Sequence, residues 1–214
     1  DVGTTMYFND KGNYVPHAGW QKQIAPDWNG YSGIEIHGLV EDMNELTPQE
    51  PEKQNTFKQS YYTAPDIKKE SLIKEVGERL QRKGIKASAI FSVDQIANTG
   101  LLDILPAHAT KMDALMYLEK HFKISKKHIV YAGDSGNDIE PITSGYHAVL
   151  VNNARQEIKD EIKKIAHKKK CEDSIYFARG GYKDMNGNYA AGILEGVAHF
   201  VKNGMVTLSK KSLA

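Results

Sequence analysis

The spacing of apolar residues changes character along the chain and predicts two kinds of segment. In residues 67–84 the apolar positions from Leu72 to Leu80 recur every four residues, which predicts an amphipathic helix that ends at Gly84. Three shorter apolar or alternating stretches predict strands, at residues 32–40 (SGIEIHGLV), 56–63 (TFKQSYYT) and 86–93 (KASAIFSV). Together they favour a small α+β layer with one open sheet face. Before them, the turn NDKG between MYF and YV predicts a β-hairpin.

From residue 101 the pattern becomes an alternation of strands and helices. LLDILP at residues 101–106 is expected to be a short strand or an edge of this part, and Thr110 is expected to cap the following helix together with Asp113. The remaining strands are predicted at residues 128–132 and 147–151, and the remaining helices at 138–145, 155–167 and 190–204. Such an alternation predicts a parallel sheet covered on both faces.

The composition adds little to this prediction of the fold, but it argues against several classes of protein function. The 214 residues carry 28 basic and 27 acidic side chains, so the formal charge of +1 gives no reason to expect nucleic acid or a membrane surface as a partner. No apolar stretch is long enough to cross a bilayer. The single cysteine, Cys171, cannot form an internal disulfide, and we therefore expect a cytoplasmic protein.

Candidate chemistry is concentrated in the stretch IVYAGDSGND. Asp134, Asn137 and Asp138 follow a predicted strand, at the end where parallel sheets bind ligands. Two nearby carboxylates repel unless a cation lies between them, and oxygen donors of this kind suit Mg²⁺. The alternative is a polar loop in which Asp138 only caps the next helix. Taken alone, the carboxylates do not decide between the two.

Lys111 favours the functional interpretation. It begins a helix, where the helix dipole is already positive, so a lysine is poorly placed there unless an anion binds. Helix N-termini bind phosphate readily. A cation site and an anion site in one strand–helix system indicate metal-assisted phosphoryl chemistry.

At these residues the sequence resembles a known family. The stretches ATKMDALMYLEKHF, IVYAGDSGNDIEPI and YHAVLVNNA are similar to those of the haloacid dehalogenase (HAD) superfamily phosphatases, and specifically to the sucrose-phosphate phosphatases. The resemblance implies an α/β fold, with a HAD-like Rossmannoid core around a parallel sheet and an inserted α+β cap of class IIB. It implies that residues 1–22 and 102–214 form the core and residues 23–101 the cap that determines substrate specificity.

The resemblance also implies roles for individual residues. Lys111 would hold the phosphate, Asp134 would bind Mg²⁺, Asp138 would support the metal directly or through water, and Asn137 would orient the site. Three cap residues resemble sugar-binding positions, although an exposed strand end explains them equally well: Gln54, Asn55 and Lys58.

One departure from the family is large. Its members attack phosphorus with an aspartate of a D-x-D-x-[TV] motif at the end of the first strand, and no such motif occurs in the 214 residues. The opening DVGTT does not supply it, because no apolar strand precedes Asp1 and the second acidic position is Gly3. We therefore expect the amino-terminal part of the core, with the nucleophile, to lie upstream, and the 214 residues alone to be inactive and poorly stable.

The sequence thus predicts a Mg²⁺-dependent phosphatase that converts sucrose 6-phosphate to sucrose and phosphate through an aspartyl-phosphate intermediate. The alternatives are a phosphatase for another disaccharide or hexose phosphate, and a non-catalytic sugar-binding domain. We also expect a sugar-phosphate synthase as a fused or associated partner. A calcium loop at residues 184–195, ending at Glu195, is the weakest candidate, because its sixth position is Tyr189 where such loops need glycine.

Overall fold

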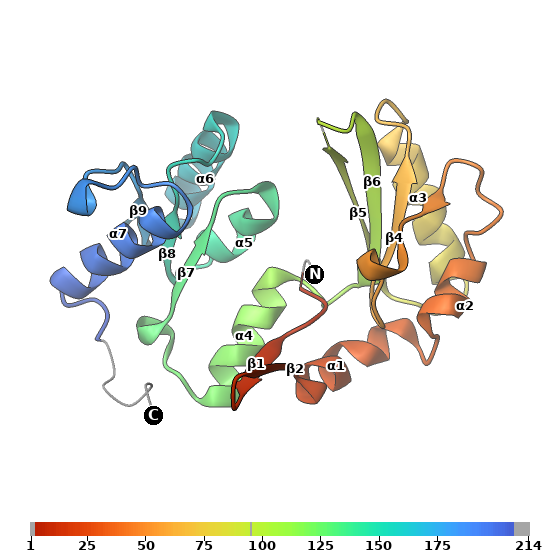
Figure 1. Ribbon diagram of the computed structural model, residues 1–214, viewed down its shortest axis with the longest axis horizontal. Coiled ribbons are helices and arrows are strands. Elements are labelled where there is room, and N and C mark those ends of the chain that lie inside the picture. Colours follow the sequence, from red (N-terminus) through yellow and green to blue (C-terminus); the bar gives the residue numbers. More distant parts are fainter. Residues whose placement is uncertain (1–2, 95, 208–214) are drawn as a thin grey trace. The chain divides into compact units, whose positions relative to one another are not determined.

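The protein consists of two units, Asp1–Ala114 and Leu115–Ala214, each with its own sheet (Figure 1). The structure is a computed structural model that describes residues 3–94 and 96–207. Asp1, the first residue of the DVGTT stretch, lies outside the described residues. Within them, no helix combines the length and the apolar character needed to cross a membrane.

The first unit begins with the hairpin that the NDKG turn predicts. Strand β1 (Tyr7–Asp10) pairs antiparallel with β2 (Asn13–Pro16), and the Asn9 side chain accepts the backbone N–H of Gly12 at 2.8 Å. The chain continues through α1 (Ala18–Ile24) and the short 3₁₀ helix η1 (Ala25–Trp28).

A four-stranded antiparallel sheet forms the centre of the first unit, in the order β3-β4-β6-β5. Helix α3 (Lys69–Gln81) contributes the predicted apolar positions to the core, where Leu72, Val76 and Leu80 are buried with Trp28 and Tyr61. The four strands are β3 (Thr47–Pro48), β4 (Gln59–Thr63), β5 (Ala87–Asp94) and β6 (Thr99–Pro106).

The placement of residues 101–106 differs from the prediction. They form most of β6, which pairs with β4 on one side and β5 on the other. Leu102, Ile104 and Leu105 are buried, so the strand is apolar on both faces, and such a stretch does not reveal its partners in the sequence. The boundary predicted between residues 101 and 102 falls inside this strand. The assignment of the layer as a cap stays a prediction.

The predicted strand at residues 32–40 is wrong, because these residues form helix α2 (Gly33–Gly38). Ser32 and Glu35 make a reciprocal capping box, in which the Ser32 N–H donates to Glu35 Oε2 at 2.8 Å. Ile36 is fully buried whereas Ile34 is 84% exposed, which fits a helix and not an alternating strand. The S-x-x-E spacing was the overlooked signal.

The second unit contains the predicted parallel sheet, in the order β7-β8-β9. Successive residues of β8 point to opposite faces: Ala148 and Leu150 join the core under α6, and Val149 packs with Phe200 of α7. The elements are β7 (Val130–Gly133), α5 (Ile139–Ile142), β8 (His147–Leu150), α6 (Gln156–Lys169), β9 (Ile175–Phe177) and α7 (Tyr189–Lys202). The sheet is thus covered on both faces, as the alternation predicts.

Helix α4 (Lys111–Phe122) contains the division between the two units, and it begins directly after Thr110, as predicted. Short 3₁₀ helices complete the described elements: η2 (Pro51–Lys53), η3 (Lys126–His128), η4 (Gly136–Asp138), η5 (Glu172–Ser174) and η6 (Tyr182–Asp184).

Truncating Ile36 tests the reassignment of α2. We expect Ile36→Ala to lower the free energy of unfolding by about 2–4 kcal/mol, because it removes a fully buried side chain. Ile34→Ala is the matched control and should change it by less than about 0.5 kcal/mol. In a strand, positions 34 and 36 would share a face, so equal losses in urea unfolding would contradict the helix.

Candidate functional site

Asp134 lies where the sequence predicts it, directly after β7 at the carboxyl end of the parallel sheet. Gly133 ends the strand opposite Leu150 of β8, and η4 follows at once. Loops at this edge of a parallel sheet are the usual place for ligands. The position therefore supports Asp134 as a site residue.

Asp138 is buried and its carboxylate holds the turn that carries Asp134. Its Oδ2 accepts the backbone N–H groups of Asp134 at 3.1 Å and Ser135 at 3.0 Å, and the Ser135 hydroxyl at 2.7 Å. Its Oδ1 accepts the Tyr131 hydroxyl at 2.5 Å. Burial and this hydrogen bond raise the pKa of Tyr131 well above its ordinary value. Asp138 therefore acts on the backbone of the turn.

The close approach of Asp138 explains the glycine before Asp134. A side chain at position 133 would overlap the carboxyl group of Asp138, so only glycine fits there. Ser135 and Asp138 also form a capping box on η4, whereas the Asp138 side chain makes no capping hydrogen bond to α5, the helix that the sequence suggested it would cap. A role in supporting a metal stays a prediction, and the contacts favour support through the turn over direct coordination.

Asn153 is a site residue that the sequence analysis missed. It follows β8, and its Nδ2 donates to Asp134 Oδ2 at 2.8 Å. The signal was present, because the pair Asn152-Asn153 comes directly after an apolar strand, and neighbouring parallel strands end at the same edge. Asn137, by contrast, is exposed in η4, and its Oδ1 accepts the Ser135 hydroxyl at 2.7 Å.

Lys111 is the first residue of α4, and the predicted cap is confirmed. Thr110 Oγ1 accepts the backbone N–H of Asp113 at 3.0 Å and donates to the Asp113 carboxylate at 2.6 Å. Lys111 is half-buried at this positive helix end. Lys111 belongs to the first unit and Asp134 to the second, so their cooperation stays a prediction.

The three predicted sugar-binding residues differ in how far their side chains are already engaged. Gln54 uses its amide within the sheet: Oε1 accepts the N–H of Ser60 at 2.7 Å, and Nε2 donates to the carbonyls of Ser60 and Gln49. Asn55 Oδ1 accepts the N–H of Phe57 at 2.9 Å. Gln54 therefore stabilises the edge of β4.

Lys58 differs from these two amides because it carries a charge. Its side chain is 13% exposed, and Nζ lies 4.0 Å from a carboxylate oxygen of Asp103 on β6. Asn55 also donates to the Thr4 hydroxyl at 3.0 Å. Sugar binding by Gln54, Asn55 and Lys58 stays a prediction, and the contacts leave Lys58 as the strongest of the three.

The donor set around Asp134 fits Mg²⁺ with few protein ligands. Within the described residues, no group of three histidine, cysteine or acidic side chains is arranged to hold a metal. Mg²⁺ is commonly bound through one or two carboxylates, with waters and substrate phosphate completing its shell. Asp134 offers one carboxylate at the sheet edge, so the residues fit such an ion but would not form an all-protein cage.

Glu195 does not behave as the last ligand of a calcium loop. It is buried, and its carboxylate accepts the Tyr176 hydroxyl at 2.8 Å and the backbone N–H groups of Arg179 and Gly180 at 2.9 Å. Although burial alone would raise it, these hydrogen bonds hold the pKa of Glu195 below its ordinary value of 4.5. Residues 185–188 form a loop between η6 and α7.

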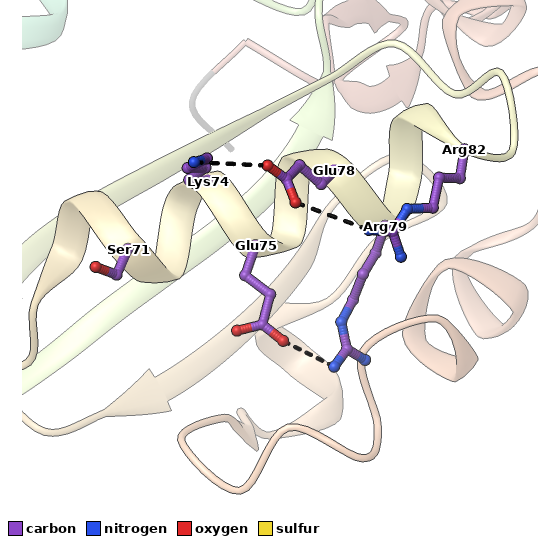
Figure 2. A pocket seen from close by; sticks show the side chains of 6 residues that line it. All are labelled: Ser71, Lys74, Glu75, Glu78, Arg79 and Arg82. Atoms are coloured by element: carbon purple, nitrogen blue, oxygen red, sulfur yellow. Dashed lines mark hydrogen bonds and ion pairs between the residues drawn. The ribbon is translucent and has the colours of Figure 1, made fainter.

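A hollow on α3 contains none of the predicted site residues (Figure 2). Its charged side chains pair with one another, including Arg79 with Glu75 at 2.8 Å and Lys74 with Glu78 at 3.8 Å. Exposed pairs of this kind at helical spacing contribute little stability and indicate a solvated helix face.

The lowered pKa of Glu195 predicts a pH-dependent stability difference. At pH 7 we expect Glu195→Gln to lower the free energy of unfolding by about 2 kcal/mol. The new amide has a single acceptor oxygen, so it cannot accept every hydrogen bond that the carboxylate accepts from Tyr176, Arg179 and Gly180. The folded pKa lies below 4.5, so this stabilisation is complete above that pH and is lost as the pH falls through the folded value. The difference in the free energy of unfolding between wild type and Glu195→Gln should therefore become smaller in acid.

Thermal unfolding measured between pH 7 and pH 3 gives this difference in stability between wild type and Glu195→Gln. Glu161→Gln, on the exposed face of α6, is the matched control and should follow wild type throughout. If the stability difference between wild type and Glu195→Gln instead became larger in acid, the lowered pKa of Glu195 would be contradicted.

Several known proteins are similar to the chain in sequence. A putative HAD-like hydrolase of Nitrosococcus oceani is 45% identical over 200 residues, which cover 94% of this chain and 54% of that protein. A probable sucrose-phosphatase 2 of Arabidopsis thaliana is 31% identical over 194 residues, covering 85% and 43%. The chain thus spans about half the length of these relatives.

Solved structures show the same fold. The sucrose-phosphatase of Synechocystis sp. PCC6803, solved with sucrose and phosphate, matches with a TM-score of 0.66 and 26% identity over 94% of this chain and 72% of that chain. A haloacid dehalogenase-like hydrolase of Bacillus subtilis matches with a TM-score of 0.56 over 97% and 68%, and at 14% identity it shows the fold alone. The family model of sucrose-6F-phosphate phosphohydrolase matches residues 1–201. The chain therefore belongs to the sucrose-6F-phosphate phosphohydrolase family.

Proposed function

We propose that the protein is a Mg²⁺-dependent phosphatase that hydrolyses sucrose 6-phosphate to sucrose and phosphate. The observation that carries the proposal is the turn after β7, where Asp138 fixes the backbone so that Asp134 stands at the ligand-binding edge of the sheet. Family membership and the likeness to a sucrose-phosphatase solved with sucrose and phosphate support the choice of substrate.

The roles of the residues follow from their chemistry. Lys111 and the capped N-terminus of α4 would bind the phosphate group, since both present positive charge. Asp134 would hold Mg²⁺, which when bound offsets negative charge on the phosphoryl oxygens. Asn137, exposed in η4, would help to orient the site, and Lys58 would contact the sugar.

We propose that the attacking aspartate comes from residues outside the 214 of this sequence. An aspartate oxygen would bond to phosphorus while the bond to the sugar oxygen breaks, and that oxygen would take a proton from the second aspartate of the same D-x-D motif. Water would then release phosphate from the aspartyl-phosphate and regenerate the carboxylate. The sequence holds no D-x-D-x-[TV] stretch to supply this group.

The edge of the parallel sheet supports this proposal. In the described part of the chain β7 pairs with β8 on one side, and no described strand pairs with its other side. The residues of β7 are only half-buried, although a parallel strand is normally covered on both faces and flanked by neighbours. A further parallel strand beside β7 would place its carboxyl end next to Asp134.

The function is tested by phosphate release from the full-length protein with Mg²⁺ and a panel of sugar phosphates. We expect sucrose 6-phosphate to be preferred, and Lys111→Ala to lower kcat/KM by roughly a hundredfold or more because it removes charge from the phosphate site. Lys120→Ala, on the exposed face of the same helix, is the matched control and should retain activity.

Two other results of this assay would change the proposed function. Preference for a different disaccharide or hexose phosphate would correct the substrate. Absence of release from every compound would favour a non-catalytic sugar-binding domain.

The origin of the nucleophile has its own test. The 214-residue polypeptide, given Mg²⁺ and sucrose 6-phosphate, should release no phosphate above background while the full-length protein does. Comparable release by both would show that the attacking group lies within the 214 residues. Circular dichroism of the short form checks that it is folded, so that unfolding is not mistaken for a missing nucleophile.

A further inference from the structure

The carboxylate of Asp134 has a neighbour, just after the adjacent strand β8, that can determine its orientation. Asn153, just after β8, donates from Nδ2 to Asp134 Oδ2 at 2.8 Å. Asp134 and Asn153 lie 19 residues apart in the sequence, and the parallel pairing of Gly133 with Leu150 brings the two strand ends together. Asn153 thus engages one of the two oxygens of Asp134.

Asn153 is itself held in one orientation. Its Oδ1 accepts the backbone N–H of Tyr189, the first residue of α7, at 2.8 Å. An amide that accepts at Oδ1 from a backbone N–H must turn its NH₂ group the other way, which here is toward Asp134. The Asn153 side chain therefore connects the start of α7 to Asp134 and cannot flip without losing both hydrogen bonds.

The loop that carries Tyr189 is anchored in turn. Asn152 donates its backbone N–H to the Gly187 carbonyl at 2.9 Å and its side-chain Nδ2 to the Asn186 carbonyl at 3.1 Å. At the other end of the loop, buried Glu195 of α7 accepts the backbone N–H groups of Arg179 and Gly180. The position of Asn153 is therefore set by a packed loop.

We propose that Asn153 is a positioning residue that fixes the carboxylate of Asp134 for cation binding. With Oδ2 held by Asn153, the carboxylate would be kept in one orientation, and Oδ1 would be the oxygen that binds the ion. Partners that orient a metal ligand in this way commonly affect metal affinity by about 10–100-fold. The proposal rests on the proposed function, because it assigns Asp134 as the Mg²⁺ ligand.

Mg²⁺ titration of the full-length protein by calorimetry tests this role without depending on activity. We expect Asn153→Ala to weaken Mg²⁺ binding by about tenfold or more, because Asp134 loses its fixed rotamer. Asn152→Ala is the matched control: it removes the adjacent asparagine side chain, but the backbone bond from residue 152 to Gly187 still anchors the loop, and the Asn152 side chain has no hydrogen bond to Asp134. It should bind Mg²⁺ as wild type does.

Thermal unfolding without Mg²⁺ separates positioning from a loss of structure. Both variants should unfold within a few degrees of each other, and Asn153→Ser, which is too short to join Tyr189 to Asp134, replaces Asn153→Ala if the alanine variant does not fold. Unchanged Mg²⁺ affinity in the Asn153 variants, or an equal loss in Asn152→Ala, would overturn the proposal. Absence of Mg²⁺ binding by wild type would also overturn it.

The proposed phosphatase activity is tested by a different measurement, the release of phosphate. A wild-type protein that binds Mg²⁺ but hydrolyses no sugar phosphate would refute that activity, while the affinities of the variants would still decide the role of Asn153.

Discussion

The candidate site depends on one buried carboxylate, that of Asp138. A charge removed from water is costly unless hydrogen bonds replace its hydration, and here two backbone N–H groups and two hydroxyls do so. Because two of these donors belong to the backbone of Asp134 and Ser135, satisfying the charge also determines the shape of the turn. The glycine at position 133 is a consequence, since a side chain there would occupy the same space.

The end of β9 uses the same physical device. Glu195 lies in a helix, yet it accepts backbone N–H groups from the loop after β9, so that loop is held by a buried carboxylate as the turn after β7 is. Between them, Asn153 at the end of β8 connects Asp134 to the start of α7. Within the described residues, hydrogen bonds thus hold the loops that follow β7, β8 and β9.

The first unit shows where pattern and structure diverge. The stretch at residues 32–40 contains apolar residues at alternating positions, but the Ser32–Glu35 capping box favours a helix, and Ile36 is buried whereas Ile34 is exposed. The Gln54 amide bonds to the backbone of Ser60 and Gln49, and sugar binding by this residue stays a prediction. Amides at a sheet edge serve either purpose, and sequence alone does not distinguish them.

The sequence by itself determined the helices and strands whose apolar residues recur at a regular spacing. It also determined that acidic residues, Asp134 and Asp138, follow β7. The apolar spacing of α3, α6 and α7, the cap at Thr110 and the parallel strands are encoded by residues within a few positions of one another, so they could be predicted. The tertiary structure decided that β6 pairs with β4 and β5, that Asp138 serves the turn, and that Asn153 reaches Asp134. These depend on which strands become neighbours and which buried charges find donors, and interactions between distant residues leave no periodic signal in the chain.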